Sequence, residues 1–281
     1  MAIKKTKPNT PKRRHATYDD FSDISRNVSP EKRLLKIKKK NSGRNNQGKI
    51  TVRHRGGGVK RYIRLIDFKR DKFNIPAVVK TIEYDPNRGS RIALVSYFDG
   101  DKRYIVAPVG LKVGDKIVSS KELVEIKAGN AMPLKFIPAG ISVHNIEIEP
   151  GMGAKIARGA GNAVSIMGIE GKYAQVKMPS GEIRLIKKES LCTVGQVSNP
   201  DKMHIKIGSA GRKRLLGIRP TVRGTAMNPN DHPHGGGEGK QSIGLKGPKT
   251  KWGKPALGVK TRKKRRSNKL IVKRRPSKKK K

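Results

Sequence analysis

The chain has 281 residues and a formal net charge of +45, from 66 Lys and Arg against 21 Asp and Glu. Charge of one sign at this density repels itself in a compact state unless a polyanion neutralises it. Because the sequence shows no apolar run of membrane-spanning length, no long amphipathic basic helix and no secretory leader, nucleic acid is the expected partner, not a membrane. The lone Cys192 cannot form an internal disulfide, so we expect it to be buried and the protein to be cytoplasmic.

The positive charge is concentrated at the two ends. Residues 239–281 contain no acidic residue, and residues 1–60 contain only four. Both ends are rich in Pro, Gly, Asn and Ser and lack apolar periodicity, so alone they are expected to be disordered. We interpret them as extensions that become ordered against phosphates, with solubilising tails as the alternative, and binding should therefore weaken steeply with salt.

Short strands separated by turn residues dominate the middle of the chain. The first set is predicted at 49–53, 60–67, 77–84, 90–98 and 102–107, with Asp99-Gly100 as a hairpin turn. Such a set is typical of a small barrel of the oligonucleotide-binding type. A second set, which indicates a second small barrel, is predicted at 133–137, 142–148, 154–158, 163–169, 172–178, 182–187 and 192–197.

The sequence therefore predicts an all-β protein with two small barrels in tandem and long basic extensions. The predicted boundaries are 1–45 for the N-terminal extension, 46–125 for the first barrel, 126–200 for the second, and 201–281 for a Gly/His loop with the basic C-terminal extension.

Three segments combine glycine with basic residues: "RHRGGGVKR" at 53–61, "DPNRGSR" at 85–91 and "GMGAKIARGAGNAV" at 151–164. Glycine lets the backbone approach a phosphate closely, and arginine can bind a phosphate through two hydrogen bonds. The alternative is a set of plain hairpin loops with solvated arginines.

The segment "NPNDHPHGGGEGK" at 228–240 resembles a metal or catalytic site, with Asp231, His232 and His234 as candidate ligands. A structural zinc site needs four ligands, usually including cysteines, and a catalytic histidine needs a nucleophile and a pocket. The segment also fails as a phosphate-binding P-loop, because Gln241 follows Lys240 where Ser or Thr is required. Since the basic stretch "AGRKRLLGIRPTVRG" precedes it at 210–224, we predict a loop that lies against folded RNA, with no metal.

Aromatic residues are few, and Trp252 is the only tryptophan. This argues against a base-stacking platform and favours recognition of structured RNA through its shape and phosphates. The predicted RNA-binding residues are Arg53, Arg55, Lys60, Arg61, Arg88, Arg91, Lys155, Arg158, Arg212, Lys213, Arg214, Arg219, Arg223, His232, His234, Lys240, Lys263, Lys264, Arg265 and Arg266.

Nearly the whole chain resembles the family of bacterial-type large-subunit ribosomal protein two. The resemblance rests on "RHRGGGVKR", "EYDPNR", "GNAMPL", "IPAGISVHNIE" and "GKPALGVKTRKKRRSNKLIVKRR", and most specifically on "RPTVRGTAMNPNDHPHGGGEGK". It implies an oligonucleotide-binding-type barrel followed by an SH3-like barrel, and a primary binder of large-subunit ribosomal RNA. Arg88 and Arg158 match barrel residues that the family uses for RNA binding, and His232 matches a loop residue suspected of a role in peptide-bond formation.

The resemblance further implies roles in ribosome assembly, in subunit association and in the architecture of the peptidyl-transferase region. The partners it implies are ribosomal RNA, other ribosomal proteins and the small subunit, and no homo-oligomer is expected. We interpret the protein as a non-enzyme and His232 as architectural; no cofactor is expected, apart from magnesium ions that the RNA could bring. Two other hypotheses stay open: a metal-dependent hydrolase or transferase built on Asp231, His232 and His234, and a nonspecific nucleic-acid chaperone or DNA-compacting protein.

Overall fold

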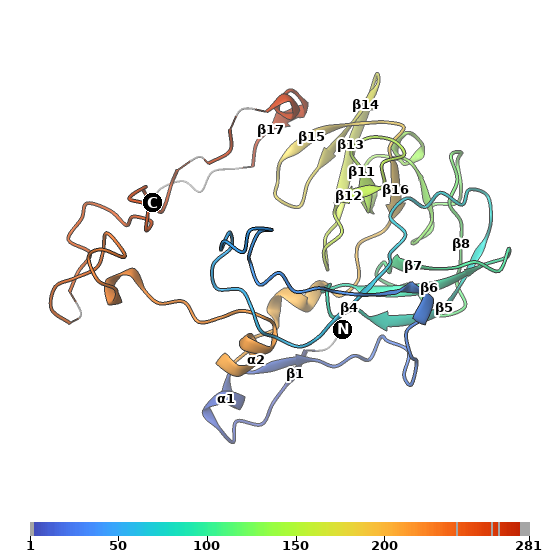
Figure 1. Cartoon of the computed structure of the whole chain (residues 1–281). Helices are drawn as coiled ribbons and strands as arrows, with labels where there is room; N and C mark the ends of the chain where they lie inside the picture. Colours follow the sequence, from blue (N-terminus) through green and yellow to red (C-terminus); the bar gives the residue numbers. More distant parts are fainter. Residues whose placement is uncertain (1–2, 240, 260, 264, 276–281) are drawn as a thin grey trace. The chain divides into compact units, whose positions relative to one another are not determined.

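The computed structural model describes residues 3–239, 241–259, 261–263 and 265–275 (Figure 1). Strands dominate it, and its α-helices are α1 (Pro11–Arg14) and α2 (Ala210–Leu215). Within the described chain, neither helix has the length and apolarity needed to cross a membrane. Two compact units are present: the sheet unit, made of Met1–Lys39, Lys60–Ser209 and Ser267–Lys281, and the loop unit, made of Lys40–Val59 and Ala210–Arg266.

The first sheet of the sheet unit has four antiparallel strands in the order β7-β6-β5-β8. Their bounds are β5 Ala77–Tyr84, β6 Arg91–Tyr97, β7 Lys102–Val106 and β8 Lys116–Ile117. The central strand β6 is apolar from Ile92 to Val95 because both its faces are covered there. Ala93 and Val95 face the main core, and Ile92 and Leu94 belong to a second cluster with Tyr104. That second cluster is closed by Leu34 and Ile66. Near it, β3 (Leu35–Ile37) pairs with β4 (Tyr62–Arg64).

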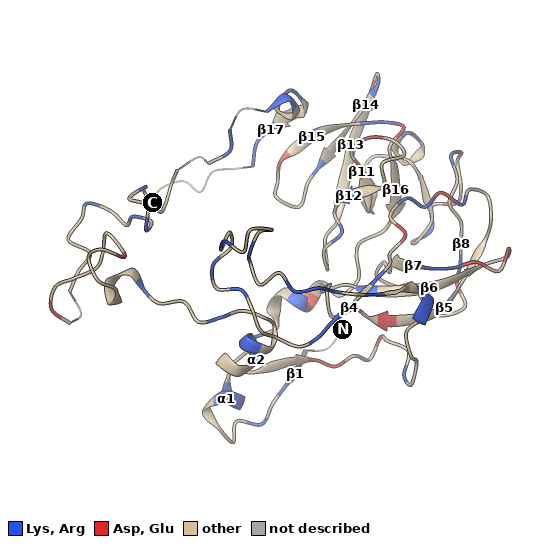
Figure 2. Ribbon diagram, viewed as in Figure 1, with Lys and Arg blue, Asp and Glu red and all other residues tan. Residues whose placement is uncertain are grey.

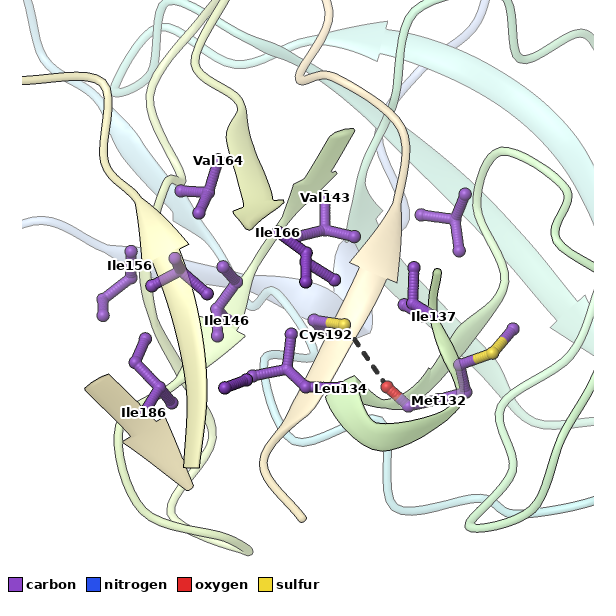
Figure 3. Close-up of a cluster of buried hydrophobic side chains, with 13 residues drawn as sticks. Met132, Leu134, Ile137, Val143, Ile146, Ile156, Val164, Ile166, Ile186 and Cys192 are labelled. Atoms are coloured by element: carbon purple, nitrogen blue, oxygen red, sulfur yellow. Dashed lines mark hydrogen bonds between the residues drawn. The ribbon is translucent and has the colours of Figure 1, made fainter. Parts of the chain in front are cut away.

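The second sheet has seven strands in the order β17-β15-β14-β13-β10-β16-β9. Their bounds are β9 Ala131–Pro133, β10 Ser142–His144, β13 Val164–Glu170, β14 Tyr173–Lys177, β15 Ile183–Lys187, β16 Leu191–Val194 and β17 Ile271–Lys273. Figure 3 shows the apolar core beneath it, in which Cys192 is buried as predicted and its thiol donates to the carbonyl of Met132. Burial raises the pKa of this thiol, which keeps it in the neutral form.

The remaining elements are short. These are β1 Ile3–Lys5, β2 Thr17–Asp19, β11 Ile146–Glu147, β12 Ala154–Ile156 and the 3-10 turns η1 Lys32–Leu34, η2 Leu134–Phe136, η3 Pro200–His204, η4 Gly224–Ala226 and η5 Arg266–Leu270. The predicted strand at 133–137 is therefore wrong beyond Pro133, because the chain turns into η2 there. The other six strands of the second set are found close to their predicted places, and the all-β class is confirmed.

The extensions differ from the expected disordered arms. In the sheet unit, β1 pairs with β2, and Ile24 packs against the core of the first sheet. At the other end of the chain, β17 adds to the edge of the second sheet beside β15. For Ile24 and β17 the ordering contacts come from distant parts of the chain, which local sequence patterns do not show.

The loop unit has almost no regular structure, and none of its described residues is buried. The predicted strand at 49–53 is wrong: Ile50 makes a single bridge with Arg44, and Ile50 and Val52 are exposed. The acidic residues of the loop unit are only Asp231 and Glu238. Figure 2 shows Lys and Arg spread along the loops of this unit. A unit with so little core and so much positive charge needs further contacts to be stable.

Candidate RNA interface

Arg88 and Arg158 meet at one aromatic ring, although they lie seventy residues apart in the sequence. The Arg88 guanidinium carbon lies 5.7 Å from the centroid of the Phe68 ring. For Arg158 the corresponding distance is 4.5 Å. Such stacking orients a guanidinium. In Arg88 one N–H group donates to Asp85, and the others stay available for a ligand. Asp85 already pairs with the Arg88 guanidinium, but two guanidinium groups at one ring still suit an anion that bridges them.

The turn that carries Arg88 is rigid. The buried Asp85 accepts hydrogen bonds from the Asn87 backbone N–H at 2.8 Å and from the Arg88 guanidinium. The Asn87 amide donates to the Tyr62 carbonyl at 2.7 Å, and the Arg61 guanidinium donates to the Pro86 carbonyl at 3.0 Å. The Arg88 side chain is therefore preorganised, which lowers the entropic cost of binding.

The loop that carries Arg158 is held in an unusual backbone conformation. Its preceding residue, Ala157, has a φ of 50°, a left-handed conformation that costs energy for a residue with a side chain. The Ala157 carbonyl accepts the Asn145 backbone N–H at 3.2 Å, which helps to fix it. Arg158 itself is exposed, as is Lys155 on β12.

Two further lysines join this site. The Asn199 amide donates to the Gly89 carbonyl at 2.8 Å, which brings η3 against the Arg88 turn. Gly89 consequently packs on the aliphatic part of Lys202, and Lys38 donates to the Asn87 side chain at 3.0 Å. We call Lys38, Arg88, Arg158 and Lys202 the Phe68 cluster. The sequence analysis missed Lys38 and Lys202, because no local motif marks residues that tertiary contacts bring together.

The position of Arg91 requires a correction. Predicted to lie exposed at the same turn, it is instead 1% exposed, and its guanidinium donates to Asp19 at 2.7 Å and to Asp23 at 2.9 Å. Burial lowers the pKa of Arg91, but the two carboxylates outweigh it and raise the net pKa. Arg91 therefore anchors the N-terminal segment, and its guanidinium is not displayed to a ligand.

In the loop unit, the glycine-rich stretch at 53–59 lies beside the stretch that follows α2. The Gly56 N–H donates to the Gly217 carbonyl, and the Arg219 N–H donates to the His54 carbonyl, both at 3.0 Å. At Gly58 a side chain would come within 2.8 Å of the Gly217 backbone, so only glycine fits. This packing leaves the basic side chains outward: among the predicted residues of this region, those exposed are Arg53, Arg55, Lys213, Arg214, Arg219 and Arg223.

The remaining predicted residues take varied positions. Lys60 is exposed, and Arg61 and Arg212 are partly buried. Lys263, Arg265 and Arg266 are exposed, while Lys240 and Lys264 lie outside the described residues.

The histidine loop is tightly folded. His232 Nδ1 accepts the His234 backbone N–H at 3.0 Å, and His234 Nε2 accepts the Lys249 N–H at 2.8 Å. The centroids of the His232 and His234 rings lie 4.7 Å apart. A Cβ atom on Gly224 would come within 2.4 Å of His232 Nδ1. Partial burial lowers the pKa of His232, and the nearby His234 and Arg53 lower it further, which suits a ring nitrogen that accepts a hydrogen bond.

This geometry also bears on the metal hypothesis. One ring nitrogen of each histidine is occupied as a hydrogen-bond acceptor, so it cannot ligate a metal without breaking the loop's own bonds. In the described part of the chain, no three His, Cys, Asp or Glu side chains converge as metal ligands do.

Two family models match the chain. Ribosomal Proteins L2, RNA binding N-terminal domain, matches residues 31–119, and Ribosomal Proteins L2, C-terminal domain, matches residues 127–253. The chain belongs to the ribosomal protein L2 family. It is thus a structural, RNA-binding protein of the large ribosomal subunit and takes part in translation.

The L2 match divides the Phe68 cluster between its two domains. Arg88 and Phe68 lie in the range matched by the RNA-binding domain, and Arg158 and Lys202 lie in the range matched by the C-terminal domain. The histidine loop also lies in the C-terminal match. Residues from both L2 domains therefore contribute to one basic site.

Proposed function

We propose that this L2 protein is a primary binder of large-subunit ribosomal RNA, with the Phe68 cluster as its main contact in the sheet unit. The convergence of Arg88 and Arg158 on Phe68 carries the proposal. Arginines on rigid turns bind backbone phosphates well, and a site built from both domains can recognise the shape of a folded RNA. On this view the protein supports assembly of the large subunit.

The loop unit has a complementary role in this proposal. It lacks buried residues among those described, so RNA would take the place of a core and raise its stability. The exposed predicted residues of the loop unit, together with the described part of the basic tail, would contact phosphates as the loop unit orders against RNA.

We further propose that the histidine loop shapes the peptidyl-transferase region and aids subunit association. His232 acts there by holding the loop, with catalysis left to the RNA and with no cofactor. Its ring accepts a backbone N–H and packs on Gly224, and these contacts are structural. The hydrolase alternative predicts turnover by the isolated protein and metal retained after desalting. The chaperone alternative predicts equal affinity for duplex DNA and folded ribosomal RNA.

The test compares the affinity of single variants for large-subunit ribosomal RNA. Arg88→Gln and Arg158→Gln should each weaken binding by about tenfold, because each removes a charge-assisted hydrogen bond. Lys116→Gln is the matched control, since Lys116 pairs with Val78, about 20 Å along β5 from the Arg88 turn. Unchanged affinity in both arginine variants, with unchanged circular dichroism, would remove the Phe68 cluster from the interface.

A further inference from the structure

Trp252, the only tryptophan in the chain, is held at the tip of a tight turn and left in solvent. The turn is closed by the Thr250 N–H, which donates to the Lys254 carbonyl at 2.7 Å, and by the Gly253 N–H, which donates to the Thr250 carbonyl at 2.9 Å. Although its backbone is fixed, Trp252 is 68% exposed. Burial of so large an aromatic side chain would stabilise the fold, and its exposure gives up that stabilisation. A role in ligand binding is the better explanation for its exposure.

Two cations lie close to the Trp252 ring. The Arg53 guanidinium carbon is 5.3 Å from the ring centroid, and the Lys251 ammonium is 5.4 Å from it. An exposed ring with cations close to it suits a ligand that has both a flat face and negative charge. A nucleotide has both.

Arg53 also lines an open pocket in the same unit. The pocket has a volume of about 560 Å³, which is within the range of small-ligand sites. Its basic lining consists of Arg44, Arg53, Arg55 and Arg219, and its glycine wall consists of Gly56 and Gly57. Among the described residues, no acidic side chain lines it, and none of these four arginines makes an ion pair with a carboxylate there. The pocket therefore has unneutralised positive charge beside backbone that can approach a phosphate closely.

We propose that Trp252 and this arginine pocket form a nucleotide seat: the ring stacks on an unpaired base of the RNA, and the arginines bind the adjoining phosphates. The proposal rests on the proposed function, because it identifies which part of a ribosomal RNA the loop unit recognises. It adds base stacking to an interface that the sequence predicted to read shape and phosphates alone. Stacking on an exposed aromatic ring is tolerant of sequence, so the seat requires an unpaired nucleotide but no particular base.

Trp252 reports on its own site, since all tryptophan emission comes from this side chain. The full chain is titrated with a twelve-nucleotide oligoadenylate and, separately, with inorganic polyphosphate of equal charge. We expect the oligoadenylate to quench the emission and protect Trp252 from acrylamide, because a stacked base covers the ring. Polyphosphate should bind without either effect. The seat would be refuted if both ligands quenched the Trp252 emission equally, or if saturating oligoadenylate neither quenched the emission nor protected Trp252 from acrylamide.

Variants separate the ring from the pocket. Trp252→Leu should weaken oligoadenylate binding by about tenfold and leave polyphosphate binding unchanged, whereas Arg53→Gln should weaken both. Lys254→Gln, in the same turn, is the charge control and should retain quenching. If Trp252→Leu binds both ligands as the unaltered chain does, the seat is refuted. If ribosomal RNA binds without changing the fluorescence of Trp252, only the nucleotide seat is refuted. If the chain does not bind ribosomal RNA at all, the proposed function is refuted.

Discussion

The replacement of Arg91 by Gln tests whether this residue anchors the N-terminal segment or contacts RNA. The Arg91 side chain is 1% exposed, and those of its partners Asp19 and Asp23 are 10% and 25% exposed. Removal of one member of a buried ion pair costs about 3–5 kcal/mol, because the other charges stay buried without a partner. Since a domain is stable by only about 5–15 kcal/mol, this loss is large.

Urea unfolding measures the loss, and hydrogen exchange locates it. We expect Arg91→Gln to lower the free energy of unfolding by about 3 kcal/mol or more and to expose the backbone of residues 17–25 to exchange. Asp23→Asn should cost less, because Asp23 is more exposed and Asp19 still pairs with Arg91. Lys116→Gln, at an exposed position on β8, is the control that should leave stability unchanged.

The pH dependence gives an independent check of the same pair. Burial raises the pKa of Asp19, but the bonds from Arg91 outweigh burial and lower the net pKa. Stability from this pair is therefore complete above the unfolded pKa of about 4 and is lost as pH falls below it. The difference between Arg91→Gln and the unaltered chain should shrink in acid. An Arg91→Gln protein that is as stable as the unaltered chain but binds RNA poorly would show that Arg91 is an RNA contact after all.

Three more predictions follow from other parts of the structure. Burial lowers the pKa of His144 to about 4, below an ordinary value near 6.5, so the unfolded chain takes up a proton that the folded chain does not. As the pH falls from 6.5 to 4, the free energy of unfolding should therefore decrease by about 3 kcal/mol. His144→Gln should abolish this pH dependence. Gly224→Ala should displace the His232 ring without unfolding the sheets, seen as shifted imidazole resonances and slower peptide transfer in reconstituted subunits; unchanged resonances would contradict the packing. Deletion of residues 240–281 should flatten the salt dependence of RNA binding by about 0.7–0.9 in log–log slope for each lost phosphate contact, and an unchanged slope would mean that this tail touches no phosphate.

Local patterns predicted most strands, because strand formation here depends on alternation and on turn residues. The segment at 77–84 was predicted from such alternation and forms β5 with the same bounds. The segment at 49–53 has the same kind of pattern but lies in a unit in which no described residue is buried, so its apolar side chains lack a core among those residues. Periodicity predicts a strand only where a second layer covers it.

The candidate site was only partly predictable, because its members come together through tertiary contacts. Arg88 and Arg158 were predicted singly, and their meeting at Phe68 has no signal in the sequence. Arg91 lies three residues after Arg88 in the same Gly-containing segment, and nothing in the sequence distinguishes the two. Arg91 is nevertheless buried, because it pairs with Asp19. Lys202 joins the cluster because the Asn199 amide reaches the Gly89 carbonyl. Motifs therefore identify which residue types are present, and packing decides which of them face a ligand.

In the proposed function, this basic chain recognises folded ribosomal RNA. The most direct test is equilibrium binding of the full chain to refolded large-subunit ribosomal RNA and to duplex DNA of equal charge, each measured over a range of salt. We expect a preference for the ribosomal RNA that persists as salt rises, and loss of that preference when Arg88 and Arg158 are both replaced by Gln. Equal affinity for the two nucleic acids at every salt concentration would contradict it.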